Sequence, residues 1–116
     1  MRNIIFYEDH FTDFYFKQPE KVQRKIDYVL DLVRNVDRVP EKFLKHLTNT
    51  DGIYEIRVSV GNNIYRILCF WDDGDVVVLV NSFQKKTQKT PKGQINKAER
   101  LKAEYFAEKK NQENQT

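Results

Sequence analysis

Two arginines stand on neighbouring strands of a predicted β-hairpin, at a spacing that would bring them face to face. The strands are rich in β-branched and aromatic residues and are joined by Gly61-Asn62, a strong tight-turn signal; they run from Ile53 to Val60 and from Asn63 to Trp71. A two-residue loop sets Arg57 directly opposite Arg66. Like charges in this position repel each other, whereas guanidinium groups bind phosphate well. The pair therefore predicts a site for a polyanion.

A third strand would add to the same surface. Asp73-Gly74 is another tight-turn signal, and it predicts an antiparallel strand from Asp75 to Phe83. The same counting sets Arg66 opposite Asn81 and Ile64 opposite Phe83. Because side chains alternate between faces, the basic face would hold Arg57, Arg66, Asn81, Phe83 and Lys85. The other face would be the apolar core, formed by Ile56, Val58, Val60, Tyr65, Ile67, Cys69, Trp71, Val76, Val78 and Val80.

The pattern alone leaves two interpretations of the basic face open. In one, Arg57 pairs with Glu55 or another carboxylate and Arg66 is an ordinary solvated side chain. In the other, the face binds a polyanion. The segment from Lys85 to Lys110 favours the second, since it carries nine Lys or Arg against three Glu in a chain of formal net charge +3. A solvated helix face followed by a charged tail would give the same composition.

The elements around the three-stranded meander predict an α+β sandwich. They are a strand from Asn3 to Tyr7, a helix around Phe11 to Tyr15, a helix from Pro19 to Asn35, a short helical turn from Glu41 to Leu47 and a helix from Gln94 to Lys109. We expect an antiparallel sheet with helices on one face and a partly open second face. Residues 1–110 would form one domain and residues 111–116 a polar, disordered tail.

Composition narrows the classes of function. A hydrophobic content of 40% indicates a folded domain, and the single cysteine, Cys69, excludes an internal disulfide. Its strand position predicts a buried side chain. Neither His10 nor His46 has a partner at metal-ligand spacing, so we expect no metal site and no cofactor. No apolar run reaches transmembrane length and no signal-peptide core is present, so the expected location is the cytoplasm.

The basic face could bind single-stranded RNA and could also cleave it. Phosphate contacts would come from Arg57, Arg66, Lys85 and Lys86, and base stacking from Phe83. Attack of a ribose 2′-hydroxyl on the next phosphate needs charge neutralisation, a base and an acid. The candidate bases are Lys85 or Lys86 with a lowered pKa, or His46 if its loop folds over the face. Tyr54 has core parity and is expected to be structural.

Several motifs of the chain resemble those of a known toxin family. They are Gly52-Ile53-Tyr54-Glu55-Ile56-Arg57-Val58, Tyr65-Arg66-Ile67-Leu68 and Phe83-Gln84-Lys85-Lys86-Thr87-Gln88-Lys89-Thr90-Pro91, followed by a helix with Ala98 and Tyr105. Together they strongly resemble HigB-like toxins of the RelE/ParE superfamily of bacterial and phage toxin-antitoxin systems. The resemblance covers nearly the whole chain, and the third motif is its most specific part.

The resemblance implies a RelE-like fold and a toxin that cleaves mRNA in the ribosomal A site without a metal. It also implies neutralisation by a helix-turn-helix antitoxin. Carried over by motif, Arg57 and Arg66 would contact the scissile phosphate, and Phe83 would stack or line the site. Lys85, Lys86 and Lys89 would bind phosphate or assist proton transfer, and Asn81, Lys45 and His46 would add to the RNA-binding surface.

One element of the family pattern is missing. The RelE pattern has a tyrosine near the beginning of the final helix, and the stretch near Lys92 has none; Tyr105 lies about three turns further on and is not assigned that role. The base is therefore left open. Two other functions also remain: ParE-type action on DNA gyrase, which the basic face disfavours, and RNA or ribosome binding without cleavage, which uses the same cations.

Overall fold

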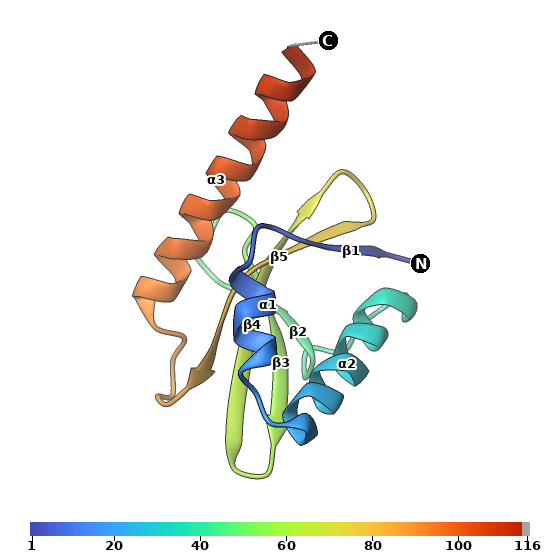
Figure 1. Cartoon of the computed structure of the whole chain (residues 1–116), viewed down its shortest axis with the longest axis vertical. Coiled ribbons are helices and arrows are strands. Elements are labelled where there is room, and N and C mark those ends of the chain that lie inside the picture. Colours follow the sequence, from blue (N-terminus) through green and yellow to red (C-terminus); the bar gives the residue numbers. More distant parts are fainter. Residues whose placement is uncertain (115–116) are drawn as a thin grey trace.

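The computed structural model describes residues 1–114, which form a five-stranded mixed sheet with helices on both faces (Figure 1). The strand order is β1-β5-β4-β3-β2. The strands are β1 (Asn3–Phe6), β2 (Leu44–His46), β3 (Tyr54–Val60), β4 (Asn63–Asp72) and β5 (Val76–Lys85). The helices are α1 (His10–Phe16), α2 (Glu20–Asn35) and α3 (Lys92–Asn114). The predicted α+β fold is confirmed.

Helix α2 forms where the apolar stripe predicts it. Pro19, with φ −59°, stands at its N-cap, and the buried side chains follow at helical spacing: Val22, Ile26, Val29, Leu30 and Val33. Arg2 closes the far end of the helix, because its guanidinium donates hydrogen bonds to the carbonyl oxygens of Val33 and Val36 at 2.9 and 2.5 Å. These contacts tie the N-terminus of the chain to the end of α2.

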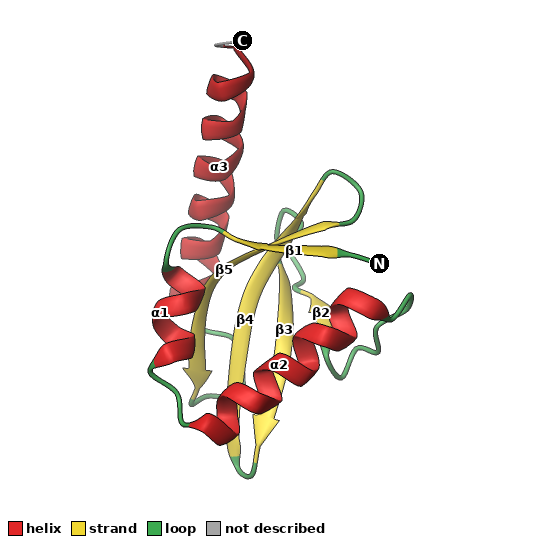
Figure 2. Cartoon of the chain, turned by 45° about the vertical axis from the view of Figure 1, so that its right-hand side comes forward, coloured by secondary structure: helices red, strands yellow, loops and turns green. Residues whose placement is uncertain are grey.

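The sheet carries a separate apolar core on each face. Helices α1 and α2 lie in front of the sheet and α3 behind it (Figure 2). Ile26 and Val29 of α2 pack with Ile56 and Ile67 in the first core, which we call the α2-side core. The second core, on the α3 side, joins Ala98 and Leu101 of α3 to Ile53, which precedes β3, and to side chains of β4 and β5: Leu68, Phe70, Val78, Val80 and Phe83. We call it the α3-side core. The second face is therefore more fully covered than expected, and only the end beyond α3 is open.

The β3–β4 hairpin has the predicted register. Val60 pairs with Asn63, and Arg57 pairs with Arg66. Gly61, at φ +59°, supplies the left-handed backbone that the tight turn requires. The prediction that depended on this turn, two arginines side by side on one face, is confirmed.

The β4–β5 register differs from the prediction. Asp72 pairs with Val76, so the loop has one residue more than expected, and an irregularity between Ile67 and Cys69 adds a second shift. Consequently Arg66 pairs with Phe83, not Asn81, and Ile64 pairs with Lys85, not Phe83. The first shift also reverses the start of β5: Val77 and Leu79 belong to the α2-side core, while Val78 and Val80, predicted there, belong to the α3-side core.

The remaining differences concern the direction of β1, the presence of β2 and the length of α3. β1 is parallel to β5, whereas an antiparallel sheet was expected. The predicted helical turn from Glu41 to Leu47 is correct only in its first part: residues 41–43 form a turn in which Leu44 N–H donates to the Pro40 carbonyl oxygen, whereas Leu44–His46 form β2 antiparallel to β3. Helix α3 continues to Asn114, so most of the predicted disordered tail is helical, and residues 115–116 lie outside the described residues. No helix within residues 1–114 has the length and apolarity needed to cross a bilayer.

Candidate functional site

A buried carboxylate holds the two opposed arginines. Glu55 precedes Arg57 on β3 by two residues, so both side chains lie on the same face. Its Oε2 atom accepts a hydrogen bond from Arg57 Nε at 3.0 Å and lies 2.9 Å from Arg66 Nε, and Glu55 is only 2% exposed. The interpretation that Arg57 pairs with Glu55 is thus confirmed. The solvated Arg66 of that interpretation is wrong, because Arg66 is 6% exposed.

Arg66 is held mainly by charge. Its Nη1 donates to the carbonyl oxygen of Tyr65 at 3.1 Å, whereas its Nε lacks hydrogen-bond alignment with Glu55 despite the short distance. Burial lowers the pKa of the Arg66 guanidinium, the Glu55 carboxylate raises it and the Arg57 charge lowers it again. One carboxylate therefore faces two guanidinium groups, which leaves a net positive charge at this end of the sheet.

Glu55 also anchors the segment that follows β5. Thr90 Oγ1 donates to Glu55 Oε1 at 2.7 Å, and Thr87 Oγ1 donates to the Lys89 carbonyl oxygen at 2.8 Å. The segment from Lys86 to Pro91 is thereby fixed beside the arginines. Sequence reasoning treated Glu55 only as a pairing partner of Arg57 and missed this role. The signal available was its parity, which places a carboxylate on an otherwise basic face.

Lys85 ends β5 beside this cluster and is partly buried. Its pKa is lowered, first by burial and then by the Arg66 charge, with Glu55 opposing and Arg57 and Lys45 adding to the effect. A lowered pKa makes an ammonium group a better proton donor and its amine form more accessible. Lys86 and Lys89 follow as exposed side chains. The structure thus assembles the predicted cations Arg57, Arg66, Lys85 and Lys86 in one place.

These cations line an open depression of about 810 Å³. Its wall includes Arg57, Arg66, Lys85 and Lys86, and neutral polar side chains such as Gln84 and Gln88 surround them. No aromatic side chain lines it among the described residues. The depression therefore suits a phosphate-rich ligand better than an apolar one.

Two predicted RNA-binding residues support α3 rather than the depression. Asn81 is 3% exposed, and its Nδ2 donates to the Gln94 backbone oxygen at 3.0 Å and to Gln94 Oε1 at 2.9 Å. Phe83 shares the face of the arginines, but it is 9% exposed and packs in the α3-side core, so little of its ring is open to a base. Neither residue was recognised from sequence as part of a helix interface.

The two candidate RNA-binding residues of β2, Lys45 and His46, lie on opposite faces of the sheet. Lys45 pairs in register with Glu55 and so shares the face of the cations. His46 pairs with Tyr54, and their ring centroids lie 5.0 Å apart on the other face. Its loop does not fold over the cations, so the structure gives no support to His46 as the base. Tyr54 packs against Trp71 and the α2-side core, as expected for a structural residue, and Cys69 is fully buried as predicted.

The arrangement meets two of the requirements for phosphoester chemistry. Fixed guanidinium groups can neutralise charge that develops on a phosphate, and Lys85 places an ammonium group with a lowered pKa, the kind of group that proton transfer needs, at the same place. Glu55 is unsuited to act as the base, because both of its carboxylate oxygens already accept contacts from Arg57, Arg66 and Thr90.

Two solved structures of other proteins are similar to this chain. A chain of the RelB–RelE antitoxin–toxin complex from Methanococcus jannaschii is similar, with a TM-score of 0.52 and 20% identity over 71% of this chain and 91% of that chain. A chain of the RelE–RelB complex from Pyrococcus horikoshii OT3 aligns with a TM-score of 0.48 and 17% identity over 70% of this chain and 91% of that chain. No curated protein sequence matches the chain.

The family described as "Phage derived protein Gp49-like (DUF891)" matches residues 13–103. This range extends from α1 into α3 and includes the carboxylate, both arginines and the lysines of the depression. The chain therefore belongs to the phage-derived Gp49-like family.

Proposed function

We propose that this chain is the toxin of a toxin–antitoxin pair and that it acts as an endoribonuclease on mRNA bound in the ribosomal A site. The observation that carries the proposal is the cluster of Arg57, Arg66 and Lys85 around the buried Glu55. Membership of the Gp49-like family and similarity in fold to a chain of an antitoxin–toxin complex support it. The HigB-type motifs of the sequence support the ribosome as the place of action.

The proposed reaction breaks the P–O5′ bond after attack by the neighbouring 2′-oxygen. The 2′-hydroxyl loses its proton, the new P–O2′ bond gives a cyclic phosphate and the departing 5′-oxygen gains a proton. Arg57 and Arg66 stabilise the negative charge of the phosphorane-like transition state, the Lys85 ammonium donates its proton to the departing 5′-oxygen, and the proton of the 2′-hydroxyl passes to solvent water in the open depression. These cations supply the positive charge, so the proposed reaction draws on no metal ion.

Lys86, Lys89 and Lys45 extend the charge around the depression and would contact neighbouring phosphates. The proposed role of Phe83 is structural, since it pairs with Arg66 across the strands and packs in the core beneath α3. The proposed protein partner is a helix-turn-helix antitoxin, and the proposed location is the cytoplasm, where ribosomes translate mRNA.

Primer-extension mapping of mRNA after brief induction tests the activity. The comparison includes wild type, Arg57→Ala and Lys85→Ala, with Arg100→Ala as a control because Arg100 is exposed on α3 and pairs with Glu104. Circular dichroism verifies that each variant is folded. We expect in-frame cuts with assembled ribosomes only, lost in both site variants and kept in the control.

Three results would contradict the proposal. Intact mRNA despite growth arrest by the wild type would move the target to gyrase or another protein. Intact mRNA without arrest would indicate a binding module that does not cleave RNA. Cuts that persist in folded Arg57→Ala and Lys85→Ala would keep the nuclease activity but place it elsewhere on the molecule.

A further inference from the structure

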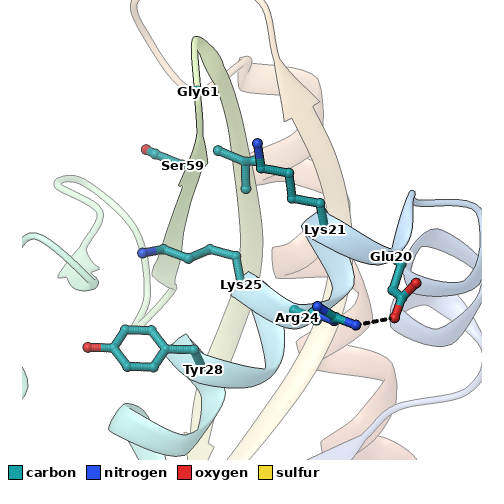
Figure 3. Close-up of a pocket in the computed structure, with 8 residues that line it drawn as sticks. Glu20, Lys21, Arg24, Lys25, Tyr28, Ser59 and Gly61 are labelled. Carbon is teal, nitrogen blue, oxygen red and sulfur yellow. Dashed lines mark hydrogen bonds and ion pairs between the residues drawn. The ribbon is translucent and has the colours of Figure 1, made fainter.

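A second concave surface lies between α2 and the outer edge of β3. It has a volume of about 780 Å³ and is lined by Lys21, Arg24, Lys25 and Tyr28 of α2 and by the turn from Ser59 to Gly61. Figure 3 shows Lys21, Lys25 and Tyr28 projecting from α2 beside Ser59 and Gly61. It is distinct from the depression around Arg66 and Lys85, which lies on the α3 side of the sheet.

The edge of β3 in this surface has unused backbone hydrogen-bonding capacity. β2 pairs only with Tyr54–Ile56, and the next outward group, Arg57 N–H, donates to the Phe43 carbonyl oxygen at 2.8 Å. Backbone groups of alternate residues point to the same edge in an antiparallel pair. Ser59, two residues after Arg57, therefore points its N–H and C=O outward, where no strand within residues 1–114 covers them.

The charge of the surface is one-sided. It contains three cations and one carboxylate, Glu20, which already pairs with Arg24 at 2.5 Å. Lys21 and Lys25 have no carboxylate partner in the part of the chain that the structure describes; Lys25 Nζ lies 5.1 Å from the centre of the Tyr28 ring. Tyr28 is 52% exposed and offers an aromatic surface between these charges and the strand edge.

We propose that this surface binds an extended acidic segment of a partner protein, which adds as a strand to β3 at Ser59. The open N–H and C=O groups of Ser59 favour a peptide, because an added strand supplies a backbone acceptor and a backbone donor to them, whereas a nucleic acid has no such regularly spaced pair. The unpaired lysines select acidic side chains. The inference rests on the proposed function, under which the partner is the antitoxin, and it adds the place and the chemistry of the contact.

Two sets of variants of the full chain test the strand and the charge separately. Ser59→Pro removes the outward N–H at a position where an edge strand tolerates proline, and Ser59→Ala is its control because it keeps the N–H. Lys21→Glu with Lys25→Glu reverses the charge, and Arg100→Glu with Lys110→Glu makes the same change on α3. The probe is the product of the neighbouring gene, purified and titrated onto each variant.

We expect Ser59→Pro and the α2 double reversal each to weaken binding by about tenfold or more, and the controls to stay within about twofold of wild type. The Ser59 amide should also gain protection from hydrogen exchange in the wild-type complex. Cleavage of mRNA by the free protein should not change in the α2 double reversal, because neither lysine lines the Arg66 depression.

Each other outcome overturns the inference in a recognisable way. Unchanged affinity in both variants would show that the partner binds elsewhere, with the proposed function intact. Loss of affinity only in the α2 double reversal, without Ser59 protection, would indicate a helix docked on α2. Loss of RNA cleavage with normal partner binding would identify a nucleic-acid surface. Failure of wild type to bind the neighbouring product would refute the antitoxin partner itself, and the inference with it.

Discussion

Replacement of Glu55 by Gln is the most direct test of how the two arginines are held. The change keeps the size of the side chain and removes the only carboxylate within residues 1–114 that contacts both guanidinium groups. Arg57 and Arg66 would then face each other across the strand pair without compensation. We expect a lower free energy of unfolding and a less ordered pair of arginines.

The size of the effect follows from burial. With charge centres about 4 Å apart and an effective dielectric constant of about 20, each pair contributes roughly 4 kcal/mol before desolvation is counted. Removing one partner of a buried pair typically costs about 3–5 kcal/mol. Arg57 is partly exposed, with a side-chain accessibility of 28%, so water screens its charge and the lower end applies. A loss of about 3 kcal/mol corresponds to a melting temperature lower by roughly 10–15 °C.

Thermal unfolding in dilute buffer, with and without inorganic phosphate, measures this effect. Glu41→Gln is the matched control, because Glu41 is exposed and its Oε1 atom lies 3.6 Å from Lys45 Nζ. Surface pairs of this kind contribute about 0–1 kcal/mol. Phosphate should stabilise Glu55→Gln more than wild type, since an anion can replace the lost charge. Equal melting temperatures for Glu55→Gln and Glu41→Gln would refute the argument that Glu55 holds the arginines.

Three further predictions concern proton transfer, alkaline stability and a glycine. Lys85→Arg should keep RNA binding but lower cleavage by about 10²–10⁴-fold, because it preserves charge and removes the transferable proton; single-turnover assays over a pH series check this. Burial and the hydrogen bond to Asp72 raise the pKa of Tyr105 to about 12, so its stabilisation is complete below pH 10, the ordinary pKa, and is lost as pH rises toward 12. Tyr105→Phe should reduce that alkaline loss in urea melts, and an unchanged slope would contradict it. Gly52→Ala should cost about 1–2 kcal/mol, because Gly52 has φ +71° and an added Cβ would lie 3.1 Å from Lys102 Nζ; denaturant unfolding checks this against Gly93→Ala, which meets no atom within 4 Å.

The sequence predicted the β3–β4 hairpin because its loop has only two residues and its turn signal is specific. From that register Arg57 faces Arg66, and the same parity brings Glu55 beside Arg57. The parallel direction of β1 was beyond reach, since a short apolar run gives no information on its partner. β2 was missed because its three residues carry no periodic pattern and are held by pairing with β3.

The β4–β5 error has a specific physical origin, and the origin bears on function. A longer loop shifts the pairing by one residue and would alone turn Phe83 and Lys85 to the α2 side of the sheet. The irregularity opposite Leu68, where Val80 and Asn81 face a single residue, shifts it once more and restores the side of Lys85.

β5 thereby serves two environments in succession. Before the irregularity Val78 packs beneath α3, and within it Asn81 binds Gln94 near the start of that helix. After it Lys85 reaches the arginines, where its pKa is lowered. A bulge of this kind commonly re-aims a side chain beside a functional site. Val80 and Asn81, the two residues at the irregularity, also contact the α3 side of the sheet. The position of Lys85, the proposed proton-transfer group, therefore depends on the same residues that hold the beginning of α3 against the sheet.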